Sequence, residues 1–147
     1  MPSAGETAVA YVDGGFRPQS GEIGSWSYII TAVDGRVLRD QGLIVGGSCT
    51  IAEYLAILKA LEGALGAGVR DLHVQSDCQS VVAQLTRQAG VRSPALRPLY
   101  RRVKGCERWF SEVRYTHVPR IHPGIRVADA AGRQVLAQEG VGGVGSG

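Results

Sequence analysis

The sequence predicts a single α/β domain in which helices flank a five-stranded mixed sheet. Segments with alternating apolar residues, which are typical of strands, are interspersed with segments whose apolar residues recur at helical spacing. The order of these segments is β-β-β-α-β-α-α-β-α. A length of 147 residues, with 44% hydrophobic and 20% charged residues, is that of one globular domain with its own core.

The first three strands are expected to form an antiparallel meander. Residues 7–16 alternate in the manner of a buried strand and carry Asp13 near its end. A stretch with proline and two glycines then predicts a turn, and residues 25–33 alternate again. The Asp-Gly pair in VDGR predicts a hairpin that leads into a third strand over residues 37–45.

A long helix follows this meander. Residues 50–68 place their large apolar side chains at helical spacing, and Gly66 and Gly68 are expected to end the helix. Residues 71–76 predict a fourth strand, and residues 77–88 predict a second helix.

The second half of the chain predicts two more helices around a fifth strand. Pro94 suits the first position of a helix over residues 93–109. Residues 111–118 alternate as a strand, and residues 125–139 predict the last helix. The glycine-rich residues 140–147 are expected to be a flexible tail outside the domain.

This order of elements gathers four acidic residues at one end of the sheet. If the first strand points up, the hairpins make the third strand point up as well, so the first helix starts at the top. A right-handed crossover then places the fourth strand parallel to the first. Asp13, Glu53 and Asp77 therefore share the carboxyl end of the sheet, and Asp129 joins them if the fifth strand is also parallel.

Structural roles compete with a functional one for some of these acids. Glu53 could close a capping box with Thr50, and Asp77 could simply favour the positive end of a helix dipole. Asp13 differs, because a carboxylate in a central strand needs a compensating partner and no lysine or arginine lies within three residues of it in the sequence. A cation from solution would provide that partner.

The types of side chain restrict the chemistry of such a site. Carboxylate oxygens without a His/Cys cluster favour Mg²⁺, with Mn²⁺ as a substitute, over zinc. Several carboxylates at one place can hold two such ions for hydrolysis of a phosphodiester. The sequence contains no GxxxxGK[ST] phosphate loop and no nucleophile elbow for a serine hydrolase.

The cysteines and the absence of long apolar runs bear on the cellular setting. Cys49, Cys78 and Cys106 are odd in number and lack CxxC spacing, so we expect reduced thiols. The sequence shows neither a long apolar run nor a basic and apolar leader. We therefore expect a cytoplasmic protein without a membrane partner. We also expect a monomer.

At this point the residues resemble a known family. The motifs VDGG, IAEYLAIL, SDCQSVV and a final AD, spread between Tyr11 and Leu136, are similar to those of type 1 ribonuclease H. The resemblance implies a ribonuclease H-like fold and Mg²⁺-dependent endonucleolytic cleavage of the RNA strand of an RNA–DNA hybrid. It also implies four metal ligands: Asp13, Glu53, Asp77 and Asp129.

The resemblance further implies contacts to the hybrid. Four positions correspond to those that read 2′-hydroxyl groups in the minor groove: Gly14, Cys49, Thr50 and Gln79. The net charge is +3, and basic residues concentrate in the second half of the chain. Four of them are expected to contact phosphates, although a solvated helix face is an equal alternative: Arg97, Arg101, Arg102 and Arg120.

The chain also departs from the family. It lacks the long basic insertion between the middle helices, so binding should be weaker and depend on its own arginines. Cys49 and Thr50 stand where asparagines are common, and Ile125 replaces the usual Asn four residues before the last acid.

The loop before the last helix offers three candidates for a basic residue that assists the reaction. They are His117, Arg120 and His122, and we favour His122 because an imidazole transfers protons near neutral pH. An exposed loop histidine without a role is the alternative.

Two other functions remain open at this stage. A catalytically silent nucleic-acid-binding module on the same fold would keep the basic surface but lose ligands, whereas all four acids are present here. A related 3′–5′ exonuclease usually carries Asp-x-Glu on the first strand, where this chain has Gly15.

Overall fold

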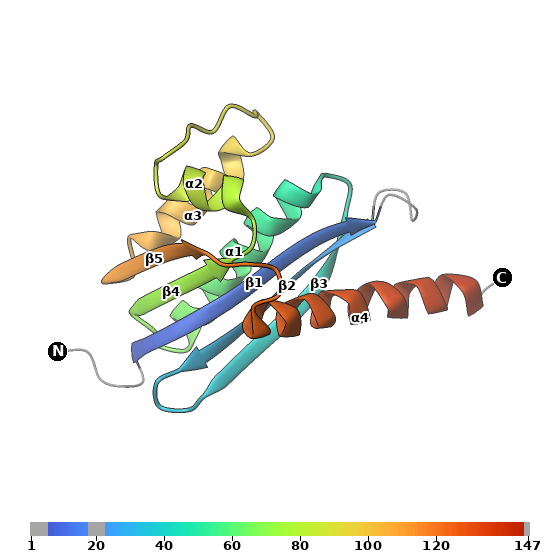
Figure 1. Cartoon of the computed structure of the whole chain (residues 1–147), viewed down its shortest axis with the longest axis horizontal. Helices are drawn as coiled ribbons and strands as arrows, with labels where there is room; N and C mark the ends of the chain where they lie inside the picture. Colours follow the sequence, from blue (N-terminus) through green and yellow to red (C-terminus); the bar gives the residue numbers. More distant parts are fainter. Residues whose placement is uncertain (1–5, 18–22, 146–147) are drawn as a thin grey trace.

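The computed structural model describes residues 6–17 and 23–145 of the chain. Residues 18–22, which contain most of the first predicted turn, lie outside the described part. Figure 1 shows a single sheet with helices on both of its faces. Within the described ranges, no helix has the length and apolar character needed to cross a membrane.

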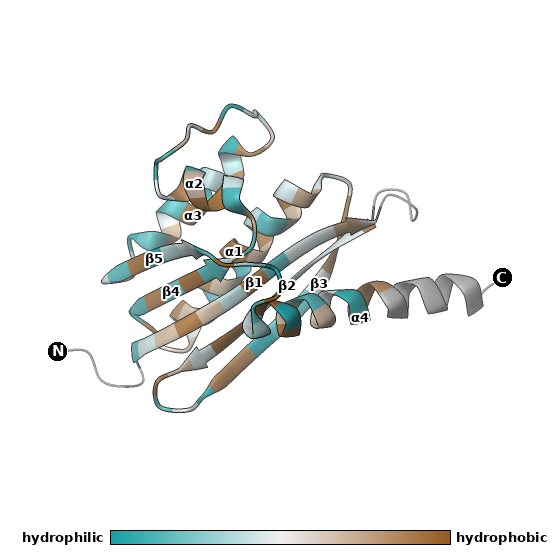
Figure 2. Cartoon of the chain, viewed as in Figure 1, coloured by the Kyte–Doolittle hydropathy of each residue, from teal (hydrophilic) through white to brown (hydrophobic). Residues whose placement is uncertain are grey.

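The sheet has the topology expected from the sequence. Its strands are β1 (Thr7–Arg17), β2 (Ile23–Ala32), β3 (Val37–Val45), β4 (Asp71–Ser76) and β5 (Glu112–His117). Their order is β3-β2-β1-β4-β5, with β1 antiparallel to β2, β1 parallel to β4, and β4 parallel to β5. The predicted fold class is therefore confirmed. Figure 2 shows the alternation of hydrophilic and hydrophobic residues along β4 that marks it as a strand.

The central strand β1 packs against a helix on each face. Helix α1 (Cys49–Gly66) lies over the face that carries Ala8, Ala10 and Val12, all of which are buried. Small side chains on the strand allow the helix axis to approach closely. The first turn of α1 therefore lies beside the end of β1, where Asp13 is placed.

The helices α2 (Gln79–Leu85) and α3 (Arg97–Glu107) lie on the same face of the sheet as α1. The prediction that α3 begins at Ser93 with Pro94 in the first turn is wrong. The amides of Leu96 and Arg97 both bond to the Ser93 carbonyl in a turn, and Pro98 occupies the first turn of the helix. Because proline lacks an N–H, an earlier start would put Pro98 where the helix needs a donor.

Helix α4 (Pro123–Gly145) crosses the opposite face over β1 and β2. It begins two residues earlier than predicted, with Pro123 in the first position that suits proline. It also includes residues 140–145, which are helical here and not an irregular tail. The domain boundary at residue 139 stays a prediction.

Two glycines allow α4 to pack closely against the sheet. A Cβ on Gly124 would lie 2.3 Å from the Tyr11 ring, and one on Gly132 would lie 2.9 Å from the Ser25 hydroxyl. The Ser27 hydroxyl donates to the Ala128 carbonyl between these two contacts. This close approach brings the next residue of the helix, Asp129, beside β1.

Candidate metal centre and nucleic-acid surface

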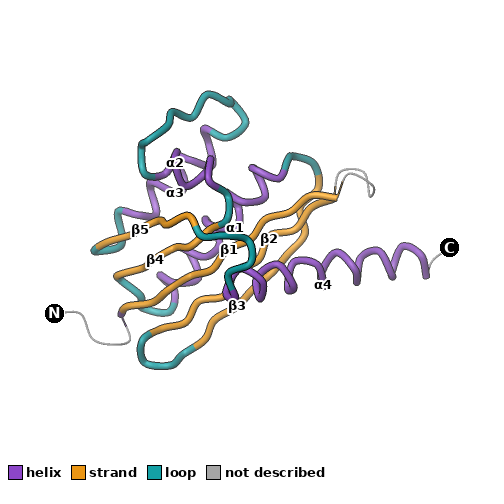
Figure 3. Tube along the Cα trace, in the orientation of Figure 1, coloured by secondary structure: helices purple, strands orange, loops and turns teal. Residues whose placement is uncertain are grey.

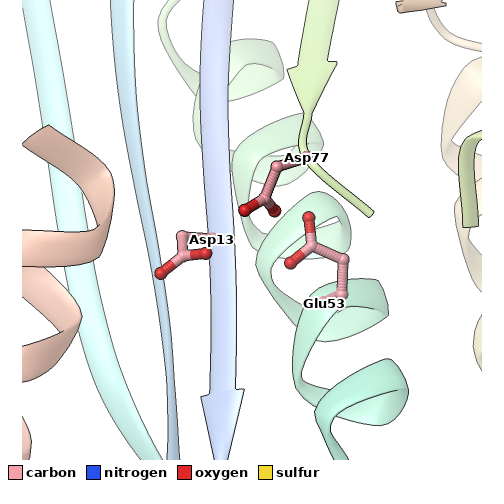
Figure 4. Close-up of side chains that lie close together, drawn as sticks. All are labelled: Asp13, Glu53 and Asp77. Atoms are coloured by element: carbon pink, nitrogen blue, oxygen red, sulfur yellow. The ribbon is translucent and has the colours of Figure 1, made fainter. Parts of the chain in front are cut away.

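Three carboxylates from distant segments converge at the carboxyl end of β1. Asp13 comes from β1, Glu53 from α1 and Asp77 from the loop after β4, and Figure 4 shows their side chains together. One oxygen of each lies within 4.8 Å of the others. The structure therefore brings together three of the four acids that the sequence places at this end of the sheet.

Glu53 is held by hydrogen bonds that reach across the fold. Its Oε2 accepts from the Gly14 amide at 2.8 Å, and its Oε1 accepts from the Ser76 hydroxyl at 2.6 Å. The capping-box alternative is wrong, because Ser48 is the N-cap and accepts from the Ile51 amide at 3.2 Å. The carboxylate of Glu53 is therefore directed at the other acids and not at its own helix end.

Gly14 is required for this contact between strand and helix. A Cβ at this position would lie 2.2 Å from the Ala52 carbonyl carbon and 2.3 Å from the Glu53 nitrogen. No side chain fits in that space, so only glycine lets the β1 backbone reach the Glu53 carboxylate.

The electrostatics of the cluster favour a bound cation. Burial is the largest cause that raises the pKa of Glu53 to about 8, opposed by the hydrogen bond from Ser76 and supported by the charge of Asp13. Burial is also the first cause that raises the pKa of Asp13 to about 7, followed by a side-chain hydrogen bond and like charge from Asp129. These buried and closely spaced carboxylates carry more negative charge than the protein neutralises locally. Their hard oxygen atoms fit a divalent cation such as Mg²⁺.

Asp129 lies on the side of Asp13 that faces α4, away from Glu53 and Asp77. It is half-buried on α4, and its Oδ2 is 2.8 Å from Nε of Arg133 one helical turn further on. The two residues line a cavity of about 320 Å³ together with Asp13 and Ser25. The fourth predicted ligand is therefore close to Asp13 but paired with an arginine.

A larger cavity of about 440 Å³ opens over the three converging carboxylates. Several of the predicted contact residues line it: Gly14, Cys49, Thr50 and Arg120. Nε of Arg120 also lies 3.4 Å from Oδ2 of Asp77. Gln79 is exposed at the start of α2 and is not one of the residues that line this cavity. Phe16 and Cys78 do line it, and no sequence pattern had singled out Phe16.

The loop between β5 and α4 places its histidines away from this cavity. Figure 3 shows this connection crossing toward the start of α4. His122 acts as the helix cap, since its Nδ1 accepts from the Gly124 amide at 3.1 Å and its ring lies 5.1 Å from the Tyr11 ring. A neutral imidazole that accepts at Nδ1 carries its proton on Nε2 and has no free acceptor. His117 is exposed at the end of β5.

The arginines of α3 are divided between two faces of the helix. Arg97 and Arg101 line a cavity of about 520 Å³ together with Arg87, whose backbone has a φ of 63°. Arg102 does not line this cavity and lies toward Cys106. Burial raises the pKa of the Cys106 thiol, and the positive charge of Arg102 opposes that rise. The three arginines of α3 that are predicted to contact phosphates therefore do not all line the same cavity. Arg87, which the sequence did not mark, takes the place of Arg102.

Comparisons with known proteins agree with this geometry. The model of a family described as reverse transcriptase-like matches residues 11–135. Ribonuclease HI of Halobacterium salinarum is 32% identical over 121 residues, which are 82% of this chain and 60% of the relative. The chain thus spans less than two thirds of the length of this curated relative.

Solved structures show the same fold. The crystal structure of ribonuclease H1 from Halobacterium salinarum superposes with a TM-score of 0.81 at 29% identity, covering 90% of this chain and 98% of that one. The structure of LC11 ribonuclease H1 in complex with an RNA/DNA hybrid has a TM-score of 0.79 at 22% identity, with coverages of 90% and 98%. At that identity the second likeness concerns the fold alone.

Proposed function

The chain belongs to the reverse transcriptase-like family of type 1 ribonuclease H domains, and on that premise we propose that it hydrolyses the RNA strand of RNA–DNA hybrids. The observation that carries this proposal is the convergence of Asp13, Glu53 and Asp77 within 4.8 Å. This site is at the carboxyl end of β1, where open α/β sheets bind their ligands.

We propose Mg²⁺ as the cofactor, with Mn²⁺ as a substitute. The three converging carboxylates would hold one ion, and Asp13 with Asp129 would contribute to a second. When bound, such ions supply positive charge that activates water and stabilises the leaving oxygen of a phosphodiester. Two of the carboxylates are buried, at 8% exposure for Asp13 and 2% for Glu53, so their attraction for a cation is weakened less by solvent than that of exposed groups.

The protein's own residues orient the site. The Gly14 amide and the Ser76 hydroxyl fix both oxygens of Glu53, so its direction does not depend on a bound ion. The exposed Arg120 adds a positive charge at the rim, where a phosphate of the substrate can approach. Thr50 and Cys49 lie on the same rim and offer a hydroxyl and a thiol to the minor groove.

A cleavage assay with separately labelled strands tests this function. We expect Mg²⁺-dependent cuts within the RNA strand of a hybrid, no cuts in the DNA strand, and no activity in EDTA or in Asp77→Asn. Hybrid binding without cleavage would identify a catalytically silent binding module instead. Stepwise removal of terminal nucleotides would identify a 3′–5′ exonuclease.

We also propose that the protein acts as a monomer, because one chain supplies all the carboxylates of the site. Light scattering coupled to gel filtration would measure this. The cytoplasmic location remains an expectation from the sequence.

A further inference from the structure

The fourth carboxylate already has a cationic neighbour within the protein. Among the described residues, only Asp13, Glu53 and Asp77 form a group of ligand atoms close enough for one ion. Asp129 is outside that group and is paired with Arg133 at 2.8 Å. Where Asp13 faces α4, two carboxylates, those of Asp13 and Asp129, therefore lie close to one guanidinium, that of Arg133.

The position of Arg133 follows from the helix. Residues four apart in an α-helix lie on one face, so Arg133 reaches back over Asp129. The contacts of Gly132 with Ser25 and of Ala128 with Ser27 fix this turn of the helix against β2. Asp129 and Arg133 are thus held above Asp13, and all three line the cavity of about 320 Å³.

The ion pair is weak enough to be exchanged. The side chain of Arg133 is 73% exposed and that of Asp129 is 29% exposed. Ion pairs with such exposure contribute on the order of 0.2–1 kcal/mol. A divalent cation that binds both Asp13 and Asp129 must therefore overcome a small but definite competition from the guanidinium.

We infer that Arg133 is a resident counter-ion of Asp129 that competes with a second divalent cation, so that the protein binds metal in two unequal steps. The first ion takes the trio of Asp13, Glu53 and Asp77, where three carboxylates face one more distant guanidinium: Arg120 lies 3.4 Å from Asp77, against 2.8 Å between Arg133 and Asp129. The second ion binds only when Asp129 is released from Arg133. This inference rests on the proposed metal centre and adds to it the order in which the ions bind.

Calorimetric titration of the full chain with Mn²⁺, without nucleic acid, tests the inference. Arg133→Gln should leave the first binding step unchanged and strengthen the second by roughly 1.4- to fivefold, the range that an exposed ion pair allows. Arg133→Lys keeps a cation and should remain close to wild type. Asp129→Asn should abolish the second step.

Arg126→Gln is the matched control, because it removes the same charge from the same helix. Within the described part of the chain, the Arg126 side chain makes no ion pair. An equal effect of both glutamine variants would overturn the inference, since it would reflect net charge alone. An unshifted or missing second step in Arg133→Gln would overturn it as well.

The same titration separates this inference from the proposed function. Asp77→Asn should abolish the first step. If the first step survives in Asp77→Asn, the proposed metal centre is wrong, whereas a failure of Arg133→Gln alone concerns only the order of binding.

Discussion

Asp13 and Glu53 couple the stability of the metal-free protein to pH. Burial, aided by neighbouring carboxylates, raises the pKa of Asp13 to about 7 and that of Glu53 to about 8. A carboxyl group with a higher pKa in the folded state adds stability that is fully present below its unfolded pKa and is lost as the pH rises through its folded pKa. The metal-free protein should therefore lose stability between about pH 4 and about pH 8.

Asp13→Asn tests this coupling. The substitution removes one buried charge, so in EDTA at pH 8 the variant should melt several degrees above wild type. The two melting temperatures should converge as the pH falls below about 4, where the carboxyls become protonated in the unfolded state as well. Mg²⁺ should raise the melting temperature of the wild type and leave that of the variant unchanged. Equal melting temperatures in EDTA at pH 8 would contradict the raised pKa of Asp13.

His122 allows capping and proton transfer to be separated. His122→Ala removes the acceptor for the Gly124 amide and should cost about 1 kcal/mol of stability. His122→Asn supplies another good cap acceptor but cannot transfer a proton, so it should keep both the stability and the turnover of the wild type. A loss of turnover of about 100-fold in both variants would instead make the imidazole part of the reaction.

At the scale of single residues, the sequence identified the acids but not what holds them. Glu53 follows Thr50 with capping-box spacing, yet its two donors lie 39 and 23 residues away in the chain. Arg133 follows Asp129 at a spacing that often produces a helical ion pair, so this contact is encoded in the local sequence. Contacts such as that of His122 with Tyr11 require the folded chain, because no local pattern encodes them.

At the scale of elements, the contact between β1 and α1 decides the geometry of the site. Gly14→Ala would place a Cβ 2.2 Å from the Ala52 backbone and push α1 away from β1. Glu53 would then lose the hydrogen bond from the Gly14 amide, and the distance between its carboxylate and that of Asp13 would change. We expect cleavage to fall by at least about 100-fold and the affinity for Mn²⁺ to fall in parallel.

Gly15→Ala is the control for this variant. A Cβ at Gly15 has no neighbour within 4 Å, so the change should leave folding and Mn²⁺ affinity near wild type. Full activity of Gly14→Ala would mean that α1 can move without cost to the site.

Helix α3 presents its arginines unequally to a polyanion. Arg97 and Arg101 face the cavity shared with Arg87, whereas Arg102 faces elsewhere. Replacing Arg97 and Arg101 by alanine should raise the Michaelis constant for a hybrid and flatten its salt dependence by nearly one logarithmic unit per lost phosphate contact. Turnover at saturation should not change.

Arg102→Ala is the matched control on the same helix and should have little effect. An unchanged salt slope in the double variant would mean that this cavity is only a solvated surface. An equal effect of Arg102→Ala would show that overall charge, and not the cavity, attracts the substrate.

The elements themselves were largely readable from the pattern. The strands at residues 37–45 and 71–76 have the predicted bounds, because alternation and turn residues are local signals. The start of α3 was missed because both Pro94 and Pro98 suit a first turn, and only the hydrogen bonds of Ser93 distinguish them. The division of its arginines was missed because a five-residue separation moves Arg102 off the face of Arg97.

At the scale of the whole molecule, the handedness of crossovers and the hairpin turns fix the topology. These rules place the ends of β1 and β4 and the start of α1 together, so the meeting of Asp13, Glu53 and Asp77 follows from the order of elements. They do not state which face the last helix covers. The seating of α4 on Gly124 and Gly132 depends on close packing that a single sequence does not reveal.

Because of their different positions in the fold, β1 and α4 are expected to differ in their resistance to local opening. Residues 8–11 are bonded to strands on both sides, whereas α4 rests on one face of the sheet only. Amide hydrogens in β1 should thus exchange with deuterium only on global unfolding, and those of α4 should exchange earlier through partial opening. Deuterium uptake followed by mass spectrometry would measure this difference. The protein would then have a partly open state that keeps three carboxylates assembled while Asp129 is detached.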